Sequence, residues 1–355
     1  DANMLHSERQ PTQISPQVDN VLECCEEAVQ AANDLLAIAK ERVAALTVIG
    51  GKLSNQALET HQTATHGLSW MATYVESLRQ MLDWANRLDA ADQLGELERL
   101  ILQIAFGEYL WQLYGGLPMS QGEFLRPQDV GLSQEDQRGM MVPGVMTLTQ
   151  HGNSDAARSR LVELVLDREG FGAFGATGLD DEYEMIRDQF RRFAQDRIIP
   201  SAHEWHLKDE LVPLEVIEEM GALGVFGLTS PEDFGGSGMS KTAMCVVSEE
   251  LSRGYIGVGS LGTRSEIAAE LIICGGTEAQ KAEWLPKIAS AEVLPTAVFT
   301  EPNTGSDLAS LRTRAVRQDD TYCITGAKTW ITHAARTDVM TMLVRTDPAT
   351  DNYSG

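Results

Sequence analysis

The sequence predicts an α+β protein with more than one domain, in which helices come first and strands follow. Three observations support this. The chain has 355 residues, more than one domain usually contains. Apolar residues recur at helical spacing until the spacing changes to two at Pro295. The run GFGAFGATG has the composition of a flexible linker. We therefore expect a helical N-terminal extension at 1–169, a linker at 170–178, a helical domain at 179–294 and a β-domain at 295–355.

The N-terminal extension is predicted to contain three long helices. After a polar lead-in, helical patterns cover Val21 to Val48, a segment that follows Lys52 to Asn55, and Leu94 to Tyr114. The second pattern has the alternating spacing of three and four that is typical of a seam between packed helices. This seam consists of Leu68, Met71, Val75, Leu78, Leu82 and Ala85. This region could have a role in oligomerisation, in partner binding or in packing against the rest of the protein. All three roles are open, and we favour packing.

The boundaries of the remaining elements are predicted from capping signals and from the positions of proline and glycine. Residues 119–152 read as mostly irregular, and a short helix follows at 154–168. In the second domain, helices are predicted at 180–199, ending at Pro200, then after Pro213, and at 241–252 and 267–273. Thr277 and Gln280 have the spacing of a capping box, which begins another helix. A hairpin around Asp319 and a strand at 339–344 complete the prediction.

Two polar motifs in the β-region predict a binding site. The first begins as a strand at Val298 and ends in a tight turn that contains Gly305 and Ser306, where backbone N–H groups and a hydroxyl suit an anion. The second, Lys328-Thr329-Trp330-Ile331-Thr332, is predicted to be a strand with Trp330 and Thr332 on the same face. A flat heterocycle with polar edges and a phosphate tail, such as a flavin, fits these groups.

The two motifs, TEPNTGSD at 300–307 and KTWIT at 328–332, resemble those of the acyl-CoA dehydrogenases. The segments at 210–253 and 276–286 are similar to the same family, and the resemblance covers about half of the chain, roughly 178–345. It implies a helical domain followed by the start of a β-barrel-like middle domain. The family's C-terminal helical domain is absent from this chain, which we therefore expect to be part of a longer protein.

The resemblance also implies a reaction, in which FAD takes a hydride from the β-carbon of an acyl-CoA after a carboxylate removes an α-proton. The expected FAD contacts are Phe299, Thr300, Gly305, Ser306, Trp330, Ile331 and Thr332, with Thr332 donating toward flavin N5. Ser306 could also contact the CoA arm. The family's catalytic glutamate is expected beyond Gly355, so no catalytic residue is assigned in this chain, and Glu301 is expected to be structural. Electron-transfer flavoprotein as the partner and a homodimer or homotetramer are further implications.

Ser260, Thr263 and Arg264 are expected at the far end of the acyl pocket. A buried arginine is costly without a partner, and a substrate carboxylate would satisfy it with two hydrogen bonds. This favours a short branched or dicarboxylic acyl-CoA. The alternative, that Arg264 pairs with Glu266, Glu270 or another internal carboxylate, is equally open. Glutaryl-CoA dehydrogenases have their arginine earlier, where this chain has Val258.

Other classes of protein are disfavoured. The G-x-G-x-x-G run at 257–262 follows a predicted helix and not a strand, so we do not expect a dinucleotide site there. The net charge of −24 argues against nucleic-acid binding. The five cysteines have no C-x-x-C spacing, so neither a disulfide framework nor a metal site is predicted. No membrane span or export signal is evident, and a cytoplasmic location is expected. A butyryl-, isovaleryl- or glutaryl-type dehydrogenase, an acyl-CoA oxidase of the same fold and a non-catalytic helical scaffold remain alternatives.

Overall fold

The computed structural model describes residues 15–168, 175–347 and 349–350. The chain divides into two compact units, Asp1–Gly178 and Leu179–Gly355. Each unit has a separate cluster of buried apolar side chains. Residues 170–174 of the predicted linker lie outside the described residues.

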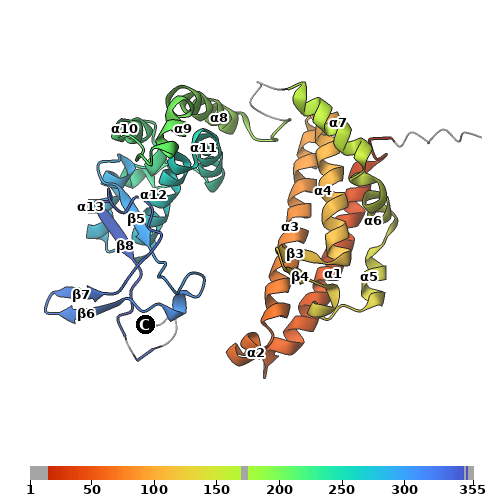
Figure 1. The fold of residues 1–355 in the computed structure, drawn as a ribbon, viewed down its shortest axis with the longest axis horizontal. Coiled ribbons are helices and arrows are strands. Elements are labelled where there is room, and N and C mark those ends of the chain that lie inside the picture. Colours follow the sequence, from red (N-terminus) through yellow and green to blue (C-terminus); the bar gives the residue numbers. More distant parts are fainter. Residues whose placement is uncertain (1–14, 169–174, 348, 351–355) are drawn as a thin grey trace, which may run out of the picture. The chain divides into compact units, whose positions relative to one another are not determined.

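Unit 1 is a helical bundle in which three long helices lie side by side (Figure 1). These are α1 (Val21–Thr47), α3 (Gln62–Ala90) and α4 (Glu96–Gly115). The predicted seam is confirmed: five of its six residues, from Met71 to Ala85, are buried in the core, and Leu68 packs against it. The shorter elements are β1 (Val48–Ile49), β2 (Lys52–Leu53), α2 (Asn55–Thr60), β3 (Leu117–Ser120), β4 (Glu123–Leu125), α5 (Gln134–Met140), α6 (Pro143–Thr147) and α7 (Asp155–Leu166).

The prediction that residues 119–152 are mostly irregular is wrong. Besides β4, α5 and α6, a 3₁₀ turn covers Pro127–Val130 and a π-helical turn covers Leu148–Gly152. These elements have only three to seven residues, too few to give a periodic pattern. They begin with local signals instead, since Ser133 and Asp136 cap α5 reciprocally and Pro143 opens α6.

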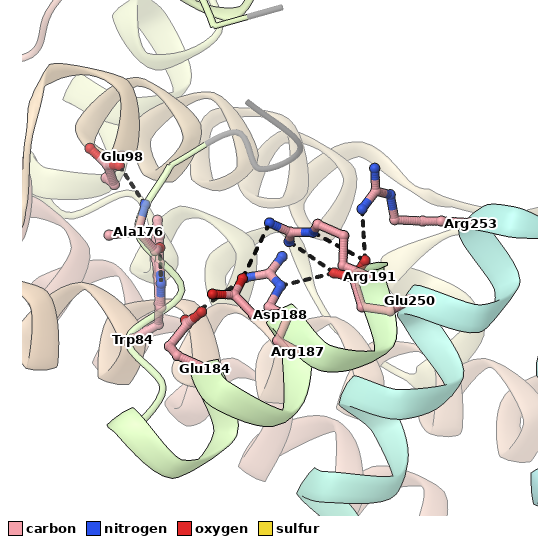
Figure 2. Close-up of polar contacts among 9 residues, drawn as sticks. All are labelled: Trp84, Glu98, Ala176, Glu184, Arg187, Asp188, Arg191, Glu250 and Arg253. Atoms are coloured by element: carbon pink, nitrogen blue, oxygen red, sulfur yellow. Dashed lines mark hydrogen bonds and ion pairs between the residues drawn. The ribbon is translucent and has the colours of Figure 1, made fainter. Parts of the chain in front are cut away.

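A buried carboxylate holds the end of the predicted linker on unit 1 (Figure 2). The Ala176 amide donates to Glu98 Oε1 over 2.8 Å, and the Trp84 indole donates to the Ala176 carbonyl over 3.3 Å. Glu98 is 3% exposed, so this bond is shielded from water. Both backbone groups of Ala176 are therefore fixed to helices α3 and α4.

Unit 2 begins with six helices and ends with four short strands (Figure 1). The helices are α8 (Asp181–Phe193), α9 (Ile199–Leu207), α10 (Leu214–Ala222), α11 (Lys241–Gly254), α12 (Ile256–Gly275) and α13 (Glu278–Ala289). The strands are β5 (Pro295–Val298), β6 (Arg314–Gln318), β7 (Thr321–Thr325) and β8 (Val339–Met342). β5 pairs with β8 in parallel, and β6 pairs with β7 as the predicted hairpin. The reciprocal cap of α13 by Thr277 and Gln280 is also confirmed.

Pro200 does not end the first helix of unit 2, contrary to the prediction. A π-helical turn at Ala194–Ile198 joins α8 to α9, and Pro200 lies in the first turn of α9. A proline is tolerated there because the first N–H groups of a helix need no intrahelical acceptor. The helical segment consequently continues to Leu207.

Helix α12 begins eleven residues earlier than the predicted start at 267, and the G-x-G-x-x-G run lies inside it. The glycines allow this helix to pack closely against neighbouring elements. A Cβ atom at Gly259 would lie 2.0 Å from Ser252 Oγ on α11, and one at Gly262 would lie 2.9 Å from a methyl carbon of Val225. The segment we expected to be a loop is therefore a helix that approaches its neighbours closely.

One buried carboxylate organises the α8–α11 contact (Figure 2). Glu250 of α11 is 0% exposed and accepts hydrogen bonds from Arg187, Arg191 and Arg253, with ion-pair distances of 3.0, 3.0 and 2.7 Å. Burial alone would raise the pKa of Glu250, but the hydrogen bonds from the three arginines outweigh it and lower the pKa. Glu250 therefore stays ionised and ties the two helices together.

Candidate flavin and acyl site

The first motif forms the predicted strand, but its hydrogen-bonded turn ends at Thr304, so Gly305 and Ser306 lie in an open bend after the turn and not within it. β5 leads into a tight turn in which Glu301 and Thr304 bond to each other through their backbones. Beyond the turn, Gly305 and Ser306 are exposed, and nothing lies within 4 Å of the place where a Cβ atom at Gly305 would be. The protein itself therefore does not require glycine at 305, and the open space leaves room for a ligand against the backbone.

Glu301 is the anchor of this turn. It is 6% exposed, and its two carboxylate oxygens accept hydrogen bonds from the amides of Arg312 (2.7 Å) and Thr313 (2.8 Å). Lys328 Nζ lies 3.1 Å from Oε1 and is itself almost buried. Burial would raise the pKa of Glu301, but the hydrogen bonds from Thr313, Arg312 and Lys328 lower it to about 2. Glu301 thus joins three segments that are distant in sequence.

The second motif is not a strand, contrary to the prediction. Residues 326–331 have no regular structure, and Trp330 and His333 have positive φ angles of 59° and 40°. A residue with positive φ interrupts the alternation of a strand, so Trp330 and Thr332 do not share a strand face. Trp330 is 88% exposed, which leaves the indole ring available to a ligand.

Instead, the two motifs run antiparallel and are joined mostly by side chains. Lys328 Nζ donates to the Phe299 carbonyl (2.8 Å), and the Thr329 amide donates to the Thr300 carbonyl (3.0 Å). Farther along, Thr296 Oγ1 donates to the Thr332 carbonyl (3.0 Å), and His333 Nε2 lies 2.9 Å from the Pro295 carbonyl. We call this arrangement of residues 295–301 and 328–333 the clasp.

The clasp places five of the seven predicted flavin residues on two adjacent segments, whereas Gly305 and Ser306 lie outside it. Phe299 and Thr300 lie on one segment, and Trp330, Ile331 and Thr332 lie on the other. Sequence reasoning missed the side chains that hold them, namely Thr296, Lys328 and His333. Lys328 lies in the second motif and His333 lies directly after it. This position was the only sign in the sequence that they could hold the site together. Phe299, which follows β5, also lines a pocket of about 400 Å³ with residues of α12, α13 and β8.

The three predicted substrate residues lie on α12, and they differ in what they can still bind. Ser260 donates to the Gly257 carbonyl and Thr263 donates to the Ser260 carbonyl, so both hydroxyl protons are used within the helix. Arg264 Nε is buried and has no hydrogen-bond partner among the described residues. A buried donor without an acceptor is costly.

The alternative partners of Arg264 are engaged elsewhere. Glu266 and Glu270 both form ion pairs with Lys241 of α11, the second at 2.8 Å. The Thr229 hydroxyl also donates to Glu266. The interpretation that Arg264 pairs with one of these two glutamates is therefore wrong. Arg264 is left with unused donors on a helix that packs against β5.

Family models identify both parts of unit 2. Residues 180–292 match the acyl-CoA dehydrogenase N-terminal domain, and residues 296–355 match the acyl-CoA dehydrogenase middle domain. Residues 180–355 therefore belong to the acyl-CoA dehydrogenase family, whose members are FAD-dependent. The open bend at Gly305 and the exposed Trp330 ring fit such a cofactor.

A relative of this chain is (2S)-methylsuccinyl-CoA dehydrogenase of Cereibacter sphaeroides, with 60% identity over 340 residues. The match covers 96% of this chain and 61% of the relative. Bovine mitochondrial isovaleryl-CoA dehydrogenase is 36% identical over 173 residues, which are 48% of this chain and 40% of that enzyme. A solved glutaryl-CoA dehydrogenase from Mycobacterium smegmatis is 38% identical over 48% of this chain and 44% of its own, with a TM-score of 0.46.

No helix among the described residues is long and apolar enough to cross a membrane. The described residues also contain no group of three or more His, Cys, Asp or Glu side chains that could hold a metal ion.

The ionised state of Glu301 predicts a loss of stability in acid. Because its pKa is lower in the folded protein, its contribution is complete above the pKa of an unfolded glutamate, about 4.3. That contribution is lost as the pH falls toward about 2. We expect Glu301→Gln to flatten the pH dependence of the free energy of unfolding in this interval, measured by urea titration. The exposed Glu215→Gln is the control, and parallel curves for wild type and Glu301→Gln would contradict the prediction.

Proposed function

We propose that the protein is an FAD-dependent dehydrogenase that converts (2S)-methylsuccinyl-CoA to mesaconyl-CoA. The observation that carries this proposal is the 60% identity to (2S)-methylsuccinyl-CoA dehydrogenase over 340 of the 355 residues. A match of this length includes the helical N-terminal extension, which the family models do not cover. The proposal includes a bacterial cytoplasmic location, electron-transfer flavoprotein as the electron acceptor, and a homodimer or homotetramer.

The clasp provides the groups that such an enzyme needs around its cofactor. When bound, FAD supplies a hydride acceptor at N5. In the proposal, Phe299 and Thr300 contact the pyrimidine edge of the flavin, Trp330 covers one side of the ring with Ile331 beside it, and Thr332 donates toward N5. Gly305 and Ser306 hold the pyrophosphate or the CoA arm. The open bend at Gly305 and the exposed indole of Trp330 support these assignments.

Arg264 is proposed to recognise the free carboxylate of the substrate. Its buried Nε lacks a partner among the described residues, and a carboxylate is the acceptor that matches a guanidinium with two parallel hydrogen bonds. Glu266 and Glu270 do not compete, because Lys241 pairs with both. Ser260 and Thr263 donate their hydroxyl protons within α12, so of the three predicted substrate residues Arg264 is the one with a donor left for a carboxylate. This arrangement favours an acyl group that ends in a carboxylate over a purely aliphatic one.

The test uses the protein expressed from the complete gene. Its visible spectrum is recorded before and after anaerobic addition of methylsuccinyl-CoA, with butyryl-CoA, isovaleryl-CoA and glutaryl-CoA as comparators. Bleaching of the oxidised-flavin band that is fastest with methylsuccinyl-CoA supports the proposal. Equal bleaching by butyryl-CoA contradicts the substrate, and oxygen consumption during turnover indicates an oxidase. A colourless protein that binds no FAD would leave the helical scaffold as the function.

A further inference from the structure

The peptide between Phe299 and Thr300 is held from one side by a nearly buried charge. Lys328 Nζ donates to the Phe299 carbonyl over 2.8 Å. The side chain of Lys328 is 8% exposed and that of Glu301, its ion-pair partner, is 6% exposed. The contact is therefore shielded from water, where an ammonium group polarises a carbonyl more strongly than it does at the surface.

The opposite side of the same peptide is free. The described chain contains no cis peptide bond, and in a trans peptide the carbonyl and the following N–H point in opposite directions. The Thr300 N–H consequently points away from Lys328. No acceptor for this N–H is present among the described residues, whereas the Thr300 carbonyl is bonded to the Thr329 amide. The clasp thus leaves one oriented donor unused next to the residues expected to meet the flavin.

The charge of Lys328 is balanced by one carboxylate. Glu301 is ionised, and its oxygens also accept the amides of Arg312 and Thr313. Part of the negative charge of Glu301 is therefore directed toward those amides, away from Lys328. Removal of either partner changes the net charge beside the Phe299–Thr300 peptide by one unit, but in opposite directions.

We propose that Lys328 and Glu301 are positioning residues that set the reduction potential of the flavin through the Phe299–Thr300 peptide. Lys328 orients and polarises this peptide so that the Thr300 N–H stabilises the negative charge that reduction places on the pyrimidine edge. Glu301 limits the strength of that effect. This inference rests on the proposed function, because it requires a flavin in the clasp.

The experiment measures the reduction potential of bound FAD by anaerobic dye-coupled titration in the protein expressed from the complete gene. Lys328→Met is expected to favour the oxidised flavin by about tenfold or more, which is a fall of about 30 mV for a two-electron couple. Glu301→Gln, which leaves the lysine charge uncompensated, is expected to shift the potential upward. Lys241→Met removes another lysine that pairs with glutamate in unit 2, outside the clasp, and is expected to leave the potential unchanged.

If Lys328 and Glu301 have only a structural role, the two variants give a different pattern of reduction potentials. In that case both clasp variants bind FAD more weakly, and the potential of the FAD that they bind either stays at the wild-type value or moves in the same direction in both; each of these results overturns the inference. Because the upward shift in Glu301→Gln is decisive by itself, a misfolded Lys328→Met does not end the test. If the wild-type protein binds no FAD, the proposed function fails. If it binds FAD and the opposite shifts are missing, only this inference fails.

Discussion

Replacing Arg264 with alanine is expected to lower kcat/KM for methylsuccinyl-CoA by about 30- to 5,000-fold, because loss of one partner of a buried charge pair costs roughly 2–5 kcal/mol. The substrate carboxylate would then be buried without its guanidinium. Butyryl-CoA has no carboxylate at this end, so its kcat/KM is expected to change by less than about tenfold. Stopped-flow reduction of the flavin with both thioesters measures the two effects.

Two further variants show whether the loss of activity in Arg264→Ala comes from substrate recognition or from misfolding. Arg264→Lys keeps the charge but not the two-pronged geometry, and an intermediate loss is expected. Arg197→Ala removes an exposed arginine that pairs with Glu219, and the preference between thioesters should stay as in wild type. If Arg264→Ala weakens the reaction with butyryl-CoA as strongly as that with methylsuccinyl-CoA, Arg264 is structural.

Replacing Glu250 with glutamine is expected to destabilise unit 2 by about 3–5 kcal/mol, since it leaves the guanidinium groups of Arg187, Arg191 and Arg253 together without their anion. For a unit of this size the loss corresponds to a fall of roughly 6–20 °C in the midpoint of thermal unfolding. Calorimetry of the protein without FAD measures this fall free of ligand effects.

The matched control is Glu219→Gln, which breaks an ion pair with Arg197 at the surface of the same unit. The two side chains are 38% and 50% exposed, so the expected cost is below about 1 kcal/mol. Equal destabilisation by the two substitutions would show that burial of Glu250 adds nothing. A wild-type midpoint in Glu250→Gln would show that the three arginines do not need their carboxylate.

The sequence predicted the long helices well because their buried faces repeat over many turns. The seam from Leu68 to Ala85 is an example, since six apolar residues recur on one side of α3. Short helices such as α5 contain fewer than two full turns, so periodicity could not identify them. Glycine caused the largest error. Gly259 and Gly262 suggested a loop, but they are needed where α12 meets α11 and Val225, a contact that no local pattern reveals.

The site residues could be proposed from the motifs, but the way the motifs are held could not. Lys328 and Glu301 lie 27 positions apart, and nothing local in the sequence indicates that both are buried and bonded to each other. Trp330 and Thr332 looked like neighbours on a strand because their spacing is two. Trp330 and His333 have positive φ angles, and the segment that contains them bonds to β5 through Thr332 and His333, contacts that no local pattern reveals.

The clasp also bears on which substitutions this protein can accept. In a β-ladder the strands are joined by backbone groups that almost every amino acid possesses, so many sequences can form it. In the clasp, four of the five contacts depend on side chains, which are those of Thr296, Glu301, Lys328 and His333. A saturation mutagenesis library should therefore be depleted at these positions far more than along the β6–β7 hairpin. In the clasp, particular side chains join the two segments, whereas backbone groups join the strands of a β-ladder. The amino acids in the short motifs are therefore restricted, which makes the motifs recognisable in the sequence.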